Sequence, residues 1–151
     1  MRTFVDATGR TWTIALNLGS AMRVRDTLNI DLLQPEVGDP PLITQLGTDE
    51  MLLGRVICVL LGDQLEAQKV TEEQVRSSFD GRTLLDAQVA FYAELTDFFQ
   101  CRGRADRAKA VAAQAKLIAL AVIAAEKRIS AFDPQAAVDG AMSGSSPAPS
   151  A

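Results

Sequence analysis

Apolar and polar side chains alternate over the first part of the chain, in residues 3–16. A period of two places Trp12, Ile14 and Leu16 on one face of an extended strand. Residues 6–10, Asp-Ala-Thr-Gly-Arg, supply a turn, because the aspartate accepts backbone N–H bonds and the glycine permits a positive φ. This pattern predicts a β-hairpin over residues 3–16. An isolated hairpin is marginal in water, so we expect helices to support it.

Further along, apolar residues recur at helical spacing. The pattern predicts helices over about residues 20–28, 48–67, 71–79, 83–99 and 105–132, with a proline-rich loop at 31–41 and a turn at 80–82. Asn17 or Ser20 suits the start of the first helix, and Thr48 or Asp49 the start of the second. Thr71 and Gln74 have the spacing of a capping box.

The second predicted helix is apolar over more than half of its circumference between residues 48 and 61, which predicts the buried centre of the domain. We expect Gly62 to fray or bend it. A broad apolar helix of this kind also offers a groove to a helical partner. Pro134 ends the last helix, and the Ala-, Ser-, Pro- and Gly-rich residues 133–151 are predicted to be disordered. The chain is therefore expected to be mainly α, a single helical domain over residues 1–132 with a small N-terminal β-hairpin.

The last predicted helix carries a heptad seam, with apolar residues in steps of four and three. The seam consists of Val111, Ala115, Ile118, Val122, Ala125, Ile129 and Phe132, and it is widened by Leu117, Leu120 and Ile123. It predicts either a helix–helix interface with another chain or packing on the chain's own core, of which we favour the own core. If a partner surface exists, we expect it at Leu117, Leu120 and Ile123.

Composition excludes several classes of function. The chain of 151 residues has no histidine, which excludes Ser-His-Asp and Cys-His catalysis and histidine-containing zinc sites. Its two cysteines cannot form a four-thiolate metal cluster, and no glycine-rich phosphate loop is present. A formal net charge of −4 argues against nucleic-acid binding. We therefore expect neither an enzyme nor a cofactor, and catalytic, cofactor-binding and metal-binding residues are predicted to be none.

The sequence also bears on cellular location and on the two cysteines. The N-terminus lacks the apolar segment of a signal peptide, and the stretch 110–125 is interrupted by Gln114 and Lys116. That stretch is predicted to be too short and too polar to span a bilayer, so we expect a soluble cytoplasmic protein without membrane contact. Cys58 lies in an apolar run and is predicted to be buried. Cys101 is either an inert thiol or one activated by the cations that follow it.

Charge is distributed unevenly along the chain. Residues 31–100 carry thirteen acidic and four basic groups, whereas residues 101–132 carry seven basic and two acidic groups. Arg102, Arg104, Arg107 and Lys109 form a basic cluster at the start of the last helix. They predict either a solvated charged turn that balances the acidic middle or a site for a phosphate or an acidic partner. The opposite charges also permit weak self-association of copies, acidic surface to basic surface.

The order of these elements and several short motifs resemble a known family. The residues concerned are Phe4-x-Asp6-x-x-Gly9-Arg10-x-Trp12-x-Ile14, Met22–Asp26, Ile30–Leu33, Asp49–Leu53, Val70–Gln74 and Leu95–Phe99. Over roughly residues 3–130 the chain is similar to the prophage-type tail assembly chaperones of long-tailed phages. The resemblance implies a small, mainly helical, non-enzymatic protein of the host-cell cytoplasm. It also implies a partner, the long helical tape-measure protein, which such chaperones coat before the tail-tube subunits polymerise round it.

The resemblance therefore implies a chaperone that binds a helical partner during phage tail assembly. The alternative is a structural or adaptor subunit of a phage tail or head–tail joint. A DNA-binding regulator acting through residues 101–109 is disfavoured by the overall acidity. For either protein-binding function, the expected partner-binding residues are Arg102, Arg104, Arg107, Leu117, Leu120 and Ile123.

Overall fold

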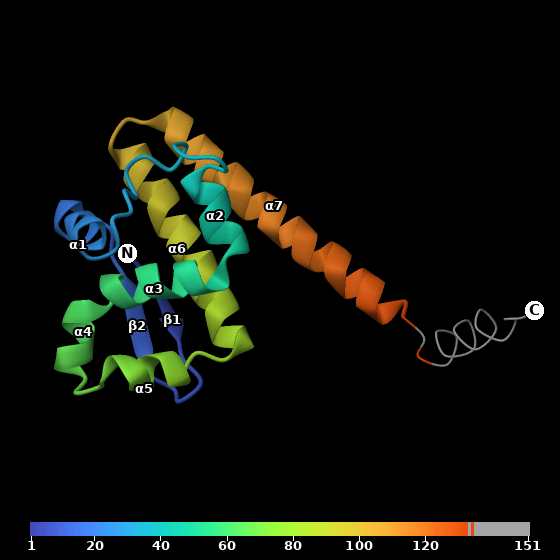
Figure 1. The fold of residues 1–151 in the computed structure, drawn as a ribbon, viewed down its shortest axis with the longest axis horizontal. Coiled ribbons are helices and arrows are strands. Elements are labelled where there is room, and N and C mark those ends of the chain that lie inside the picture. Colours follow the sequence, from blue (N-terminus) through green and yellow to red (C-terminus); the bar gives the residue numbers. More distant parts are fainter. Residues whose placement is uncertain (133, 135–151) are drawn as a thin grey trace, which may run out of the picture. The chain divides into compact units, whose positions relative to one another are not determined.

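The structure, a computed structural model, describes residues 1–132 and 134 (Figure 1). The chain divides into two compact units, Met1–Lys116 and Leu117–Ala151. Their boundary falls within the last helix, whereas the domain predicted from the sequence extends to residue 132. The predicted disordered tail, residues 133–151, lies outside the described residues except for Pro134.

The predicted hairpin is present at the N-terminus. Strands β1, Arg2–Val5, and β2, Thr11–Ile14, pair in an antiparallel ladder. Gly9 adopts a φ of +88° in the turn, a conformation that a Cβ atom disfavours. Phe4, Trp12 and Ile14 are buried, as expected from the alternation of apolar and polar positions.

Seven helices are present in the described part of the chain, and the expected mainly α fold with a small N-terminal hairpin is confirmed. They are α1 Leu18–Leu28, α2 Leu42–Thr48, α3 Glu50–Leu60, α4 Gly62–Ala67, α5 Glu72–Ser77, α6 Gly81–Cys101 and α7 Ala105–Ser130. Asn17 caps α1, and Ser20 completes a capping box with it. The predicted capping box of Thr71 and Gln74 opens α5.

Three local predictions were wrong. Helix α2 was not predicted, since its seven residues are too few to show a helical period. The predicted helix 48–67 is two helices, because the chain leaves α3 at Leu61 and α4 begins at Gly62, the residue at which a bend was expected. The predicted turn at 80–82 is instead the start of α6, where the Asp80 carboxylate accepts the N–H of Thr83.

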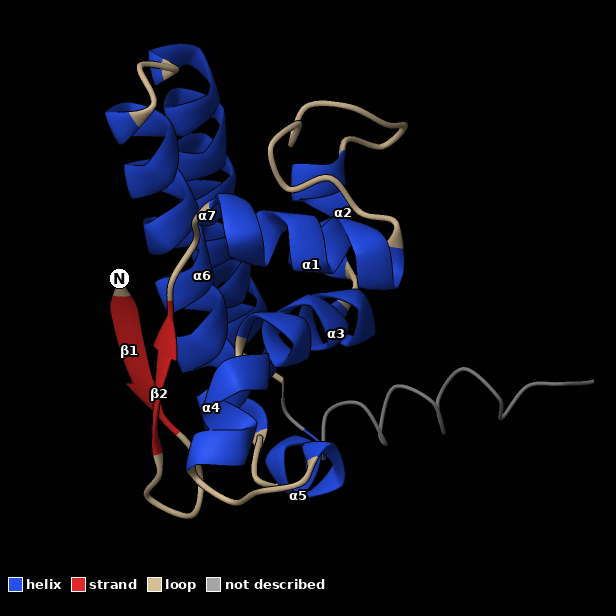
Figure 2. Cartoon of the chain, turned by 90° about the vertical axis from the view of Figure 1, so that its left-hand side faces the viewer, coloured by secondary structure: helices blue, strands red, loops and turns tan. Residues whose placement is uncertain are grey.

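Helix α6 supports both the hairpin and the other helices of the first unit (Figures 1 and 2). It packs against β1, and it contributes Phe91, Tyr92, Leu95 and Phe99 to the core. The buried Tyr92 hydroxyl donates to the carbonyl of Ile43 on α2, at 2.9 Å. Helix α3 buries Leu53, Val56 and Ile57 and contacts α1, α2, α5 and α6. The prediction that this helix lies at the buried centre is confirmed.

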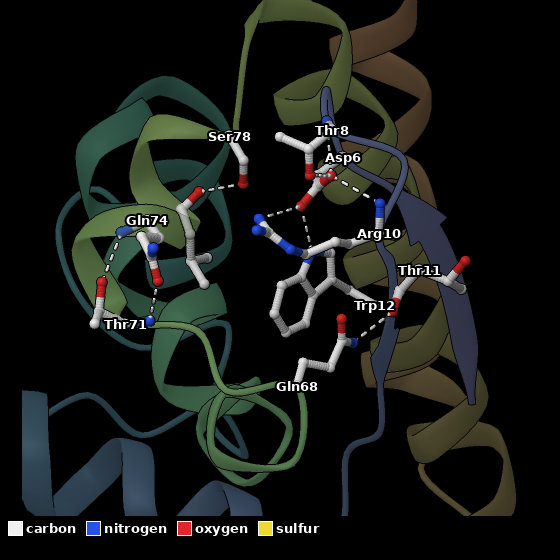
Figure 3. A network of polar contacts seen from close by, with 10 residues as sticks. Asp6, Thr8, Arg10, Thr11, Trp12, Gln68, Thr71, Gln74 and Ser78 are labelled. Atoms are coloured by element: carbon white, nitrogen blue, oxygen red, sulfur yellow. Dashed lines mark hydrogen bonds and ion pairs between the residues drawn. The ribbon is translucent and has the colours of Figure 1, made fainter.

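One buried carboxylate organises the hairpin turn (Figure 3). The Asp6 side chain is inaccessible to solvent and accepts hydrogen bonds from Trp12 Nε1 at 2.8 Å and from the Thr8 hydroxyl at 2.7 Å. It also accepts the backbone N–H groups of Thr8 and Arg10. Burial by itself raises the pKa of Asp6, but the bonds from Trp12, Thr8 and Arg10 outweigh it and hold the pKa at about 2.

Hydrogen bonds also join the hairpin to α6 and to the end of α5. The buried Glu94 carboxylate on α6 accepts the amino group of Met1 and the backbone N–H of Leu16. The backbone N–H of Ala7 donates to the carbonyl of Ser78, just after α5. These bonds connect segments that are far apart in the sequence.

We predict that Asp6→Asn lowers the free energy of unfolding by about 2–4 kcal/mol, because an amide cannot accept all the hydrogen bonds that a carboxylate accepts. The effect should depend on pH. The folded pKa lies below the ordinary value of 3.8, so the contribution of the ionised group is present above pH 4 and lost as the pH falls toward 2. Urea titrations of the wild type and of Asp6→Asn between pH 7 and pH 2 measure this.

Asp26→Asn is the matched control, because Asp26 is an exposed carboxylate on α1 with no hydrogen bond or ion pair among the described residues. We expect its stability to follow the wild type at every pH. A difference between wild type and Asp6→Asn that stays constant down to pH 2 would contradict the assignment of the ionised carboxylate as the stabilising species.

Candidate functional site

The start of α7 is held by contacts within the first unit. Ala108 and Val111 are buried, and Gln114 accepts a hydrogen bond from the Thr44 hydroxyl at 3.3 Å. The guanidinium of Arg107 forms a bidentate pair with Glu36, with N–O distances of 2.7 and 3.2 Å. These contacts anchor α7 up to about residue 114.

Beyond this anchor, α7 presents large apolar side chains to solvent. Leu117, Leu120 and Ile123 are 60%, 52% and 47% exposed, and Ile129 and Phe132 are also exposed. Of the seam residues, Val111 is buried and Ala115, Ile118 and Ala125 are half-buried, whereas Val122, Ile129 and Phe132 are exposed. Our preferred prediction, that the seam packs on the chain's own core, is therefore wrong for these three exposed residues. All three apolar residues that we selected as a possible partner surface are accessible.

The exposed part of α7 is apolar on two sides. At about 3.6 residues per turn, Leu117, Leu120 and Ile123 lie on the opposite side of the helix from Ile118 and Val122. Residues 117–125 contain no polar side chain. A helix that is apolar all round is normally covered by other protein or by lipid. We call residues 117–132 the exposed apolar segment.

Length and composition also bear on membrane contact. Within the described residues, α7 is the one helix long and apolar enough to cross a membrane by these two criteria. The prediction that residues 110–125 are too short and too polar to span a bilayer concerned only part of this helix, which is 26 residues long.

The three arginines of the predicted basic cluster differ in their surroundings. Arg104 pairs with Asp106 at 2.8 Å. The hydrogen bonds that Asp106 accepts from the Arg104 side chain and from the backbone N–H of Arg107 hold the pKa of Asp106 well below its usual range. Arg107 is bound to Glu36 and lies over the Phe99 ring. Arg102 is exposed and has no ion pair within the described part of the chain. Glu36 was not predicted as a partner of Arg107, because nothing in the spacing links two residues that lie 71 positions apart.

The other acidic groups and the cysteines considered from the sequence lie at helix starts, in the core or at the surface. Asp49 caps α3, and Glu72 lies in the first turn of α5, where acidic groups are favoured. Cys58 is buried as predicted, and burial, followed by the charge of Glu72, raises the pKa of its thiol. Cys101 is exposed. Among residues 1–132 and 134, no group of three or more acidic or cysteine side chains could hold a metal ion.

A groove of about 400 Å³ lies beside α3, within the first unit. Gly54 and Val59 of α3 line it together with Leu28, Phe79 and Leu84 from neighbouring segments, and Arg55 and Arg76 contribute charge. A Cβ atom added at Gly54 would meet no heavy atom within 4 Å, so the groove is open at this point. The groove is thus an apolar surface of the first unit, in addition to the exposed apolar segment of α7.

Comparisons with known protein families, with characterised proteins and with solved structures find no match. Function is therefore inferred from the exposed surfaces and from the sequence motifs. Of the seam residues, Ile118, Val122, Ile129 and Phe132 were not among the selected partner-binding residues, although the heptad pattern already marked them.

We predict that Arg107→Ala lowers the free energy of unfolding by about 1 kcal/mol, because it removes a bidentate ion pair and a cation–aromatic contact. Arg102→Ala is the matched control on the same segment, and we expect it to change stability by less than about 0.5 kcal/mol. Urea denaturation of both variants measures the difference. Equal effects would show that the contacts of Arg107 with Glu36 and Phe99 do not stabilise the fold.

Proposed function

We propose that the protein is a non-enzymatic chaperone that binds a long helical protein through the exposed apolar segment of α7. The observation that carries this proposal is the exposure of large apolar side chains on both sides of that segment, with Leu117 and Ile129 60% and 74% accessible. A contiguous apolar surface of this kind normally marks a protein or membrane interaction site.

The length of the segment favours a protein partner over a membrane. Because α7 is anchored up to about residue 114, the part after Lys116 has about 14 residues and measures about 21 Å. The hydrocarbon core of a bilayer is about 30 Å thick, so this part is too short to cross it. A partner helix can cover one apolar side of the segment by coiled-coil packing, and a second helix can cover the other.

The proposed identity of the partner is based on the sequence motifs. The resemblance to prophage-type tail assembly chaperones, carried by motifs such as Asp49–Leu53 and Leu95–Phe99, supports the tape-measure protein of a long-tailed phage as the partner. A protein with this task needs apolar surfaces that bind a long amphipathic helix repeatedly, and it needs no catalytic group. Both the exposed apolar segment and the groove beside α3 offer such surfaces.

The proposal predicts that the triple variant Leu117→Glu, Leu120→Glu and Ile123→Glu loses its partner. Glutamate is a good helix former and the replaced side chains are exposed, so we expect the fold to persist while the apolar contact is lost. The measurement is co-expression of the tagged chain with the longest helical protein encoded just downstream. The wild type should keep that protein soluble and copurify with it, whereas the triple variant should recover at most about a tenth as much.

The matched control carries glutamate at three exposed apolar positions outside α7, namely Leu18, Met22 and Val37. It should retain the partner. Circular dichroism and thermal unfolding of the variants should match the wild type. A downstream protein that is soluble alone, with a chain that elutes by itself, would refute the chaperone function, and a stable oligomer of fixed size would then favour the structural-subunit alternative.

A further inference from the structure

The two outer edges of the hairpin differ in their hydrogen bonding: side chains from α4 and the residue after it bond to the edge of β2. The side-chain amide of Gln64 on α4 donates to the carbonyl of Thr13 at 2.7 Å and accepts the N–H of Thr13 at 2.8 Å. Gln68 donates to the carbonyl of Thr11 at 3.0 Å (Figure 3). The outer edge of β2 is therefore occupied by glutamine side chains, which imitate a neighbouring strand.

The direction of these bonds also shows which backbone N–H and C=O groups of β1 have no partner in β2. Because Thr11 and Thr13 direct their backbone groups away from β1, the residues opposite them, Val5 and Thr3, direct theirs away from β2. Within the described residues, no other group bonds to the outward-facing backbone N–H and C=O groups of Thr3 and Val5. Figure 2 shows β1 on the outer side of the sheet. An unprotected edge of this kind is a template for an additional strand.

A hollow accompanies this open edge. It measures about 570 Å³ and is lined by residues 1–4 and by Asp86, Val89, Ala90 and Ala93 of α6. The Val89 side chain is 62% exposed. A strand added beside β1 would place every second side chain on the face of the sheet that carries Phe4, over Val89 and Ala93.

We propose that the outer edge of β1 binds an extended peptide segment of a partner protein, which adds to the sheet as a third strand. The segment carries small, uncharged apolar side chains at the alternate positions that face α6. This site is independent of the helix-binding function proposed above, because a helix has no free backbone groups along its length with which to pair the edge.

The charges around the hollow specify an uncharged segment. At one end the guanidinium of Arg2 pairs with Asp97, and at the other Arg82 pairs with Asp86. The acidic groups beside the hollow are thus already neutralised by side chains of this chain. The small side chains of Ala90 and Ala93 leave room for the side chains of the peptide, while Val89 gives them an apolar contact.

The test uses the full chain and a displayed library of random twelve-residue peptides. Peptides selected on the wild type are measured by titration against Thr3→Pro, which removes one outward-facing N–H that the β1–β2 ladder does not use. Thr3→Ala, which keeps this N–H, is the matched control. We expect uncharged, alternating apolar peptides whose affinity falls about tenfold or more with Thr3→Pro and less than about twofold with Thr3→Ala.

Val89→Asp gives a second readout that does not depend on the backbone of β1. This position is exposed on α6, so the fold should persist, while an apolar peptide should lose affinity by a similar factor. Thermal unfolding of each variant identifies any general loss of structure. Selection of no peptide, or of peptides that bind Thr3→Pro and Val89→Asp as tightly as the wild type, would overturn the proposal.

Discussion

The first unit of this protein depends on a buried, ionised carboxylate at the turn of its hairpin. Asp6 joins the indole of Trp12 to the backbone of the turn, and the pKa of about 2 expresses how strongly the surrounding donors favour its charged form. A two-stranded sheet is marginal by itself. With the turn closed in this way, Phe4 and Trp12 are held in register on one face of the sheet and form part of the core.

Helix α6 connects the hairpin to the other helices of the first unit. It packs along β1, binds the backbone of Leu16 through Glu94, and reaches α2 through the Tyr92 hydroxyl. Phe99, near its C-terminal end, lies under the guanidinium of Arg107, which is in turn paired with Glu36. A continuous set of contacts thus leads from the hairpin to the anchored start of α7. Of the predicted basic cluster, Arg104 and Arg107 form ion pairs, whereas Arg102 and Lys109 are exposed without an ion pair among the described residues.

The surfaces that remain open are the basis of both proposals. The exposed segment of α7 offers apolar side chains on two sides, suited to helices, whereas the edge of β1 offers backbone groups, suited to an extended segment. The edge of β2 differs, because Gln64 bonds to both outward-facing backbone groups of Thr13 and Gln68 bonds to the carbonyl of Thr11. Two chemically different docking modes on one small chain would allow it to bind a helix and an extended segment without competition between them.

The sequence by itself determined the hairpin, most of the helices and the capping box of Thr71 and Gln74, because these depend on local periodicity and on neighbouring residues. The alternation around Trp12 and the Thr71–Gln74 pair are local in this sense, and the heptad seam already marked the apolar segment of α7. Only the tertiary structure decided which apolar face is covered, which arginine is paired, and which strand edge is free. Those outcomes depend on pairs such as Arg107 with Glu36 and Gln64 with Thr13, whose residues lie 71 and 51 positions apart. Contacts over such separations form only when the whole chain packs, so the spacing of residues along the sequence carries no signal for them.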